Sequence, residues 1–133
     1  MPTAIALVSA VNVLRVQEGR PALTASGTLM ALAVERALAM VEGRFLGHED
    51  PSGASSSAGQ LLESTGFRGP VAELVYAGQG NLDQLAADAL RAWQSTPANR
   101  DVLLSSDYRI AGVGIQGDGT WWKASLLMAA EEP

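Results

Sequence analysis

The sequence predicts an α+β domain, in which helical segments come first and a β-hairpin comes last. Apolar residues recur at helical spacing through the first two segments and again before residues 96–97. Near the end, residues 108–116 and 120–129 flank Gly117-Asp118-Gly119, the kind of glycine turn that joins two strands. The chain has 133 residues, without an internal repeat or a linker, so we expect a single domain over residues 1–133.

The first helix is expected over residues 4–18, with Gly19-Arg20-Pro21 ending it. Ser9, Asn12 and Arg15 form a polar stripe along it. Its apolar opening lacks the positively charged segment of a signal peptide, so we interpret it as the first helix of the mature domain.

The second helix is expected over residues 28–42, with Ser26 as its N-cap and Gly43 at its end. It is apolar almost all round, which predicts the central buried helix.

The middle of the chain alternates turns with shorter elements. Residues 48–57 are expected to be a turn-rich loop, and residues 58–65 a short helix closed by Gly66. Residues 71–77 fit either a strand or an extended loop. An amphipathic helix follows residues 78–81 and is expected to end near residues 96–97.

Composition excludes several functions. The net charge is -5 and the nine basic residues are scattered singly, so we expect no nucleic-acid partner. Without cysteine, the chain has no disulfide, thiolate nucleophile or thiolate metal ligand, and its single histidine, His48, cannot build an ordinary zinc set alone. No apolar run approaches the ~20 residues of a membrane span.

Several segments resemble one family in order and spacing, the bacterial CAP superfamily of SCP-like extracellular proteins. Residues 11–23 look like its first helix and turn, and residues 47–51 (Gly-His-Glu-Asp-Pro) resemble its S-H-x-D-P turn. Residues 72–78 are similar to G-E-N-I-A-x-G, and residues 93–104 to W-x-x-S-P-G-H-R-x-N-L-L. Residues 108–114 with Trp121-Trp122 match the final hairpin. The resemblance implies an α-β-α sandwich, with a small antiparallel sheet between helical layers, and an extracellular or cell-envelope location.

In the relatives, two histidines and acidic residues line a central cleft that binds a divalent metal in some members. The resemblance implies that the residues of this cleft in the present sequence are His48, Asp50, Glu73, Asn99 and Arg100. Asn99 stands at the second histidine position, and an amide cannot replace imidazole as a strong zinc ligand or a general base. We therefore expect a degenerate site with no resident cofactor, in which His48 and Glu73 are weak candidates to hold a cation such as zinc. Asn99→His is expected to create or strengthen metal affinity.

Each candidate also has a plainer explanation. His48 could be a ligand or proton shuttle oriented by Glu73, or it could brace a turn. Glu73 could pair with His48, face solvent, or form a salt bridge with Arg68 or Arg100. Asp50 could offer oxygens to a hard cation or serve as a turn residue before a proline.

Arg100, the serine run and the paired tryptophans also allow more than one interpretation. Arg100 is expected to pair with Asp101 or Asp107, or to bind backbone carbonyls near the cleft. Residues 55–57 (three serines) lie in no nucleophile elbow and are expected to be loop. The adjacent Trp121 and Trp122 should face opposite sides of a strand, so the exposed one could be a ligand platform or simple sheet cover.

These patterns favour a non-enzymatic domain that binds a small apolar ligand, a glycan or another protein. One alternative is a divalent-metal-dependent hydrolase that uses His48 and Glu73. The other is a purely structural or adhesion module.

Overall fold

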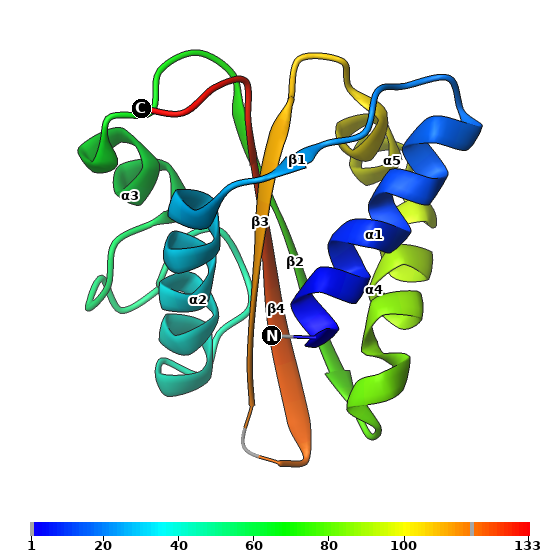
Figure 1. The fold of residues 1–133 in the computed structure, drawn as a ribbon. Helices are drawn as coiled ribbons and strands as arrows, with labels where there is room; N and C mark the ends of the chain where they lie inside the picture. Colours follow the sequence, from blue (N-terminus) through cyan, green and yellow to red (C-terminus); the bar gives the residue numbers. More distant parts are fainter. Residues whose placement is uncertain (1, 118) are drawn as a thin grey trace.

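The computed structural model describes residues 2–117 and 119–133 and shows an α-β-α sandwich, as the resemblance implied (Figure 1). Of the expected hairpin turn, Asp118 lies outside the described residues. The elements are α1 (Pro2–Gln17), β1 (Thr24–Ala25), α2 (Gly27–Glu42), α3 (Ala58–Thr65), β2 (Val71–Gln79), the 3₁₀ turn η1 (Leu82–Gln84), α4 (Leu85–Gln94), α5 (Pro97–Leu104), β3 (Ile110–Gly117) and β4 (Trp121–Ala129).

The strands form one sheet in the order β1-β3-β4-β2. β3 and β4 are the predicted antiparallel hairpin, and β2 pairs antiparallel with the other side of β4, from Val71 opposite Ala129 to Gln79 opposite Trp121. Residues 71–77 are therefore strand and not extended loop. The short β1, which the sequence did not indicate, runs parallel to β3.

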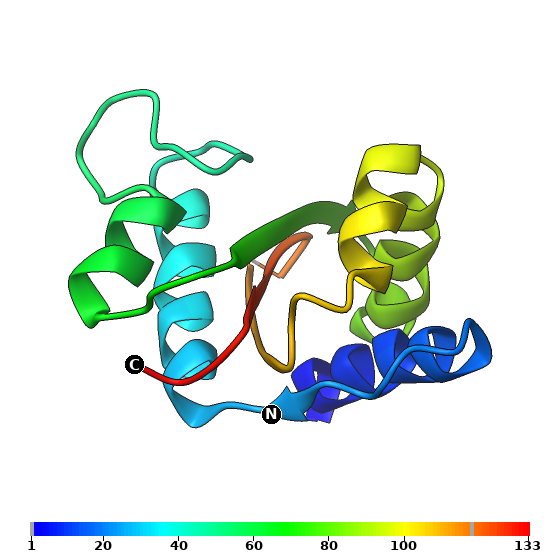
Figure 2. The ribbon, with the colours of Figure 1, turned by 90° about the horizontal axis from the view of Figure 1, so that it is seen from above.

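Two helical layers cover the sheet. α2 and α3 lie on one face, whereas α1, α4 and α5 lie on the other (Figures 1 and 2). Because side chains alternate along each strand, β4 sends Ala124, Leu126 and Met128 into the core with α1 and α4, and Leu127 and Ala129 into the core with α2 and α3.

The α2 helix lies unusually close to the sheet. A Cβ added to Gly114 would lie 2.2 Å from the backbone of Ala33, so only glycine fits there. The N-cap at Ser26 is confirmed, since its hydroxyl accepts from Leu29 N at 3.1 Å. α2 is not the central helix that its apolar sequence predicted: it lies in an outer layer, buries one face against the sheet and leaves Leu38 43% exposed.

The polar stripe of α1 also differs from expectation, because part of it points inward. Arg15 is 1% exposed and donates to the carbonyls of Pro21, Leu103 and Ser105 at 2.7–2.9 Å. Burial, with a smaller effect of the Arg20 charge, lowers the pKa of Arg15. Pro21 lies in the turn after α1, and Leu103 and Ser105 lie at the end of α5, where the last carbonyls have no partner within the helix, so the long Arg15 side chain supplies their donors.

The α5 helix was not predicted. The sequence placed a helix end near residues 96–97, and α4 does end at Gln94. Pro97 then begins α5, because proline lacks the N–H that a first helical turn leaves unbonded anyway. Among the described residues, no helix is both long enough and apolar enough to cross a bilayer.

Candidate functional site

Glu73 is the centre of a buried polar cluster. β2 directs it to the α2 face of the sheet, where its side chain is 2% exposed. Arg36 of α2 binds the carboxylate in a bidentate ion pair, in which Nε donates to Oε2 at 3.0 Å and Nη2 donates to Oε1 at 3.2 Å. Ser125 Oγ donates to Oε2 at 2.7 Å, and His48 Nδ1 lies 2.8 Å from Oε1. A carboxylate has about four lone-pair positions, and these contacts occupy all of them.

Arg36 also connects the cluster to the loop that carries His48. Its Nη2 donates to Gly47 O at 2.6 Å, its Nη1 lies 3.4 Å from Ser56 O, and its guanidinium stands 5.8 Å above the ring centre of Phe45. Sequence reasoning missed this residue. The signal was an arginine at a helical spacing that otherwise places apolar residues, such as Leu29 and Ala33, on the buried face.

The predicted contact between His48 and Glu73 is confirmed, whereas Arg68 and Arg100 are not the salt-bridge partners of Glu73; Arg36 is. The side chain of His48 is 62% exposed. Its Nδ1 faces the carboxylate, so Nε2 is the ring nitrogen that Glu73 does not engage. The His48 backbone is also held, because its carbonyl accepts from Ala58 N at 2.9 Å.

Asp50 has the geometry of a turn residue. Its two oxygens accept from the backbone N–H and the hydroxyl of both Ser52 and Ser55, at 2.7–3.1 Å. These donors, the Ser52 and Ser55 hydroxyls most of all, hold the pKa of Asp50 below its ordinary value. Asp50 lines a hollow of about 380 Å³ together with Glu35 and Glu42, apart from the Glu73 cluster.

Asn99 and Arg100 lie on α5, in the helical layer on the other face of the sheet from α2. Arg100 pairs with Glu18 at 2.8 Å, so the expected partners Asp101 and Asp107 are wrong. No hydrogen bond between described residues joins Asn99 to His48 or Glu73. The site residues carried over from the family therefore fall into three places: the His48–Glu73 pair, the Asp50 turn, and α5.

The residues present do not fit a zinc centre. Within residues 2–117 and 119–133, no group of three or more His, Cys, Asp or Glu is placed to hold a metal ion. A structural or catalytic zinc site needs at least three protein ligands, whereas this site offers one imidazole nitrogen beside a carboxylate already bound to a guanidinium.

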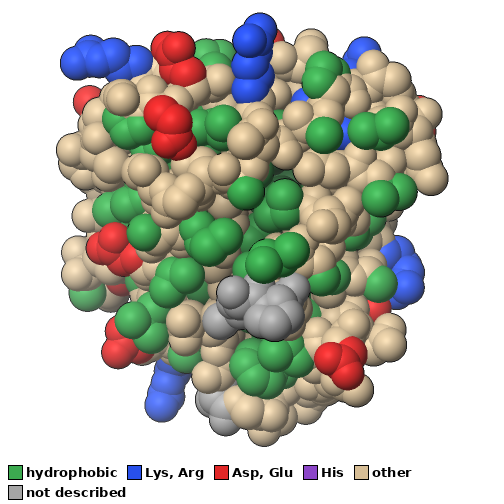
Figure 3. Space-filling view, viewed as in Figure 1, with side chains coloured by type: hydrophobic (Ala, Val, Ile, Leu, Met, Phe, Trp, Pro, Cys, Tyr) green, Lys and Arg blue, Asp and Glu red, His purple; other side chains and the backbone are tan. Residues whose placement is uncertain are grey.

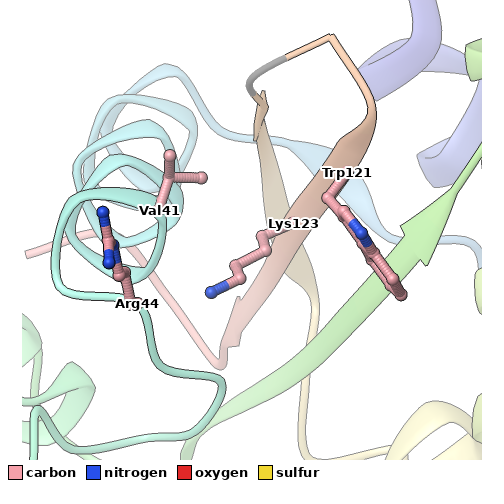
Figure 4. A pocket seen from close by; sticks show the side chains of 4 residues that line it. All are labelled: Val41, Arg44, Trp121 and Lys123. Carbon is pink, nitrogen blue, oxygen red and sulfur yellow. The ribbon is translucent and has the colours of Figure 1, made fainter.

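The two adjacent tryptophans face opposite sides of β4, as predicted. Trp122 packs against the core on the α1 and α4 face, and its Nε1 donates to Gly80 O at 3.0 Å. Trp121 is 49% exposed on the α2 side. There it lines a pocket of about 440 Å³ with Val41, Arg44 and Lys123 (Figure 4).

Basic side chains do not gather into a patch on the face of the molecule seen in Figure 3. They stand singly among apolar and acidic side chains, as the scattered basic residues of the sequence predicted.

Comparison with solved structures supports the fold. An outer surface protein from Borrelia burgdorferi matches with a TM-score of 0.75 at 20% identity, covering 94% of this chain and 90% of that one. An extracellular protein containing a SCP domain from Bacillus anthracis matches at 0.74 and 19%, covering 94% and 40%. A cysteine-rich secretory protein from Staphylococcus aureus matches at 0.68 and 20%, covering 98% and 39%. This chain thus spans about two fifths of the length of the last two proteins.

Among curated proteins, none matches this sequence significantly. The model of the cysteine-rich secretory protein family, CAP, matches residues 8–128, which is most of the chain. The fold agrees with that of the solved structures above. The chain therefore belongs to the cysteine-rich secretory protein (CAP) family, although it contains no cysteine.

Proposed function

We propose that this chain is a non-enzymatic ligand-binding CAP domain of the cell exterior or envelope. The observation that carries the proposal is the saturation of Glu73. Its lone pairs are taken by Arg36, Ser125 and His48, and its side chain is 2% exposed. A general base needs a free lone pair within reach of its proton, and a metal ligand needs one within reach of the ion.

The cluster has a structural task instead. It ties α2, β2, β4 and the loop after α2 together through Arg36, Glu73, Ser125 and His48. Buried charges are tolerated when every donor and acceptor is satisfied, and no buried polar side-chain atom among the described residues lacks a partner. The result is a rigid scaffold whose loops can present a binding surface.

The proposed location rests on the neighbours. One is described as an outer surface protein and another as an extracellular protein. The occupant on this proposal is a small ligand, a glycan or a protein, and native mass spectrometry of the purified domain tests for a co-purified small molecule. A domain found free of any ligand after this and after binding screens would favour the structural or adhesion module.

Calorimetric titration with zinc, on tag-free wild type and on His48→Ala, tests the non-enzymatic proposal. We expect no tight stoichiometric binding by either protein, because only one imidazole nitrogen is available. Stoichiometric zinc binding by wild type that disappears in His48→Ala would overturn the proposal.

One observation favours a hydrolase as the second candidate. Glu73 orients the His48 ring, and the His48 side chain stays 62% exposed. A histidine that a carboxylate orients in this way is a common general base. Ester and peptide hydrolysis with and without added zinc, compared between wild type and His48→Ala, would reveal it. Turnover that depends on His48 supports the hydrolase.

A further inference from the structure

The pocket beside Trp121 combines two cations with an aromatic face. Val41 and Arg44 come from the end of α2 and the turn after it, and Trp121 and Lys123 come from β4 (Figure 4). Trp121 and Lys123 share a face because they are two residues apart on a strand. The volume of about 440 Å³ lies within the range of small-ligand sites.

Lys123 is fixed in position before any ligand arrives. Its ammonium donates to Met40 O at 2.9 Å and to Phe45 O at 2.8 Å, and so caps carbonyls at the end of α2 and in the turn after it. An ammonium has three N–H donors, so one is left over. Carbonyls do not neutralise the charge, and no carboxylate among the described residues lies within ion-pair distance of Lys123. A held cation loses little rotamer entropy on binding an anion.

Arg44 has an unusual backbone. Its φ is +55°, in the left-handed region, and it is the one such non-glycine residue in the part of the chain that the structure describes. The turn is formed by Arg44 N to Val41 O and Phe45 N to Met40 O, the helix ending in which glycine is usual at this position. Arginine here carries strain that glycine would not. Among the described residues, its guanidinium has no hydrogen-bond or ion-pair partner.

The surrounding charges leave this pocket positive. The nearby acidic residues of α2, Glu35 and Glu42, line the separate hollow that contains Asp50. The net charge of -5 disfavours anions at the surface in general, so two cations with no carboxylate among the described residues that line their pocket are a local exception. Trp121, 49% exposed, adds a flat apolar surface on which a ring can stack.

We propose that this pocket binds a small anionic ring compound, with its carboxylate or phosphate between Arg44 and Lys123 and its flat face on Trp121. The inference rests on the proposed binding function and names its ligand class. A uronic-acid sugar and an aromatic carboxylic acid both have this chemistry. The Glu73 cluster takes no part in the contact.

The test uses the full chain with two anionic probes, glucuronic acid disaccharide and indole-3-acetate. Their neutral counterparts are the corresponding glucose disaccharide and indole-3-acetamide. Backbone NMR shifts are followed during titration, and we expect the anionic probes to shift residues around the pocket while the neutral ones bind at least tenfold more weakly. Which anionic probe binds more tightly distinguishes a sugar ligand from an aromatic one.

The decisive variant is Arg44→Gly, which removes the guanidinium and relieves the left-handed strain. We expect a higher melting temperature together with binding at least tenfold weaker, a combination that loss of folding cannot produce. Trp121→Leu should also weaken binding. Adding Arg44→Gly to it should lower the affinity by the same factor as Arg44→Gly does in the wild type. Arg68→Gln, an exposed arginine elsewhere, is the matched control and should bind as wild type does.

Binding that is unchanged in Arg44→Gly, or equal for charged and neutral probes, overturns this inference. Absence of binding by both anionic probes also overturns it. None of these three results overturns the proposed function, which fails on a different readout, namely zinc binding or hydrolysis that depends on His48.

Discussion

Replacing Glu73 with Gln should destabilise the domain far more than a surface charge change does. The substitution leaves the guanidinium of Arg36, 1% exposed, without its carboxylate. Arg36 keeps Gly47 O and Ser56 O as acceptors, but one of the two Glu73 oxygens that it binds becomes an amide NH₂, which cannot accept from it. Removing one partner of a buried ion pair costs about 3–5 kcal/mol. Small domains have only about 5–15 kcal/mol in total, so the loss is a large share.

Urea unfolding followed by circular dichroism measures this loss. With a urea dependence of about 2 kcal/mol per molar, the midpoint should fall by about 2 M. The matched control is Asp88→Asn, which breaks the exposed pair with Arg91 and should cost no more than about 1 kcal/mol.

A double-mutant cycle isolates the interaction. Arg36→Met together with Glu73→Gln removes both charges, while the Gln carbonyl can still accept from Ser125. We expect the loss in free energy of unfolding in the double variant to be smaller, by at least about 2 kcal/mol, than the sum of the losses in the two single variants. A Glu73→Gln loss no larger than that of Asp88→Asn, or additive single losses, would refute the idea that this pair braces the fold.

Three other predictions concern packing, metal affinity and pH. Gly114→Ala should destabilise the domain by at least about 1–3 kcal/mol, because the added methyl group meets the α2 backbone. Gly59→Ala, where the added methyl group meets nothing, should stabilise the domain by about 0.5–1 kcal/mol. Thermal melts that rank the two variants otherwise would contradict the close approach of α2 to the sheet. Asn99→His should leave zinc affinity in calorimetry unchanged, because α5 lies on the other face of the sheet from α2 and no hydrogen bond between described residues joins Asn99 to the His48–Glu73 pair; a gain in affinity would show instead that α5 borders the same cleft, as the family pattern implied. Burial, then a neighbouring aspartate, raises the pKa of both Tyr76 and Tyr108, so ultraviolet titration should show no phenol ionising at the ordinary value of about 10. The raised pKa means that each phenol contributes stability below pH ~10, which is lost as the pH rises through the folded-state pKa; a phenol that titrates at its ordinary value would contradict that burial.

Features set by neighbouring residues could be predicted from the sequence. The β3–β4 hairpin follows from alternation on both sides of a glycine turn, and the start of α2 from the Ser26 cap. The fold as a whole followed from family motifs spread along the chain. α5 was missed because proline is common both just after one helix and at the start of the next, so Pro97 did not tell the two cases apart.

Long-range pairing was the part that could not be predicted. Arg36 and Glu73 are 37 positions apart, and only the packing of α2 on β2 and β4 brings them together. Sequence reasoning found the His48 contact because the family motifs name both residues. The arginines that it offered as alternative partners of Glu73, and the aspartates that it offered for Arg100, are not the observed partners. Arg15 was expected only to belong to a polar stripe of the first helix. Its buried position could not be predicted for the same reason, since the carbonyls that accept from it belong to α5 and the turn after it.

The His48 ring itself gives the most direct test that the Glu73 cluster braces the fold and is not a metal centre. As the chain has one histidine, tag-free protein yields a single pair of imidazole nitrogen signals in a long-range proton–nitrogen NMR spectrum. We expect Nδ1 to carry the proton that faces Glu73, and both nitrogen shifts to stay unchanged when equimolar zinc is added. A stoichiometric shift of Nε2 to the metal-bound range on adding zinc would contradict the account.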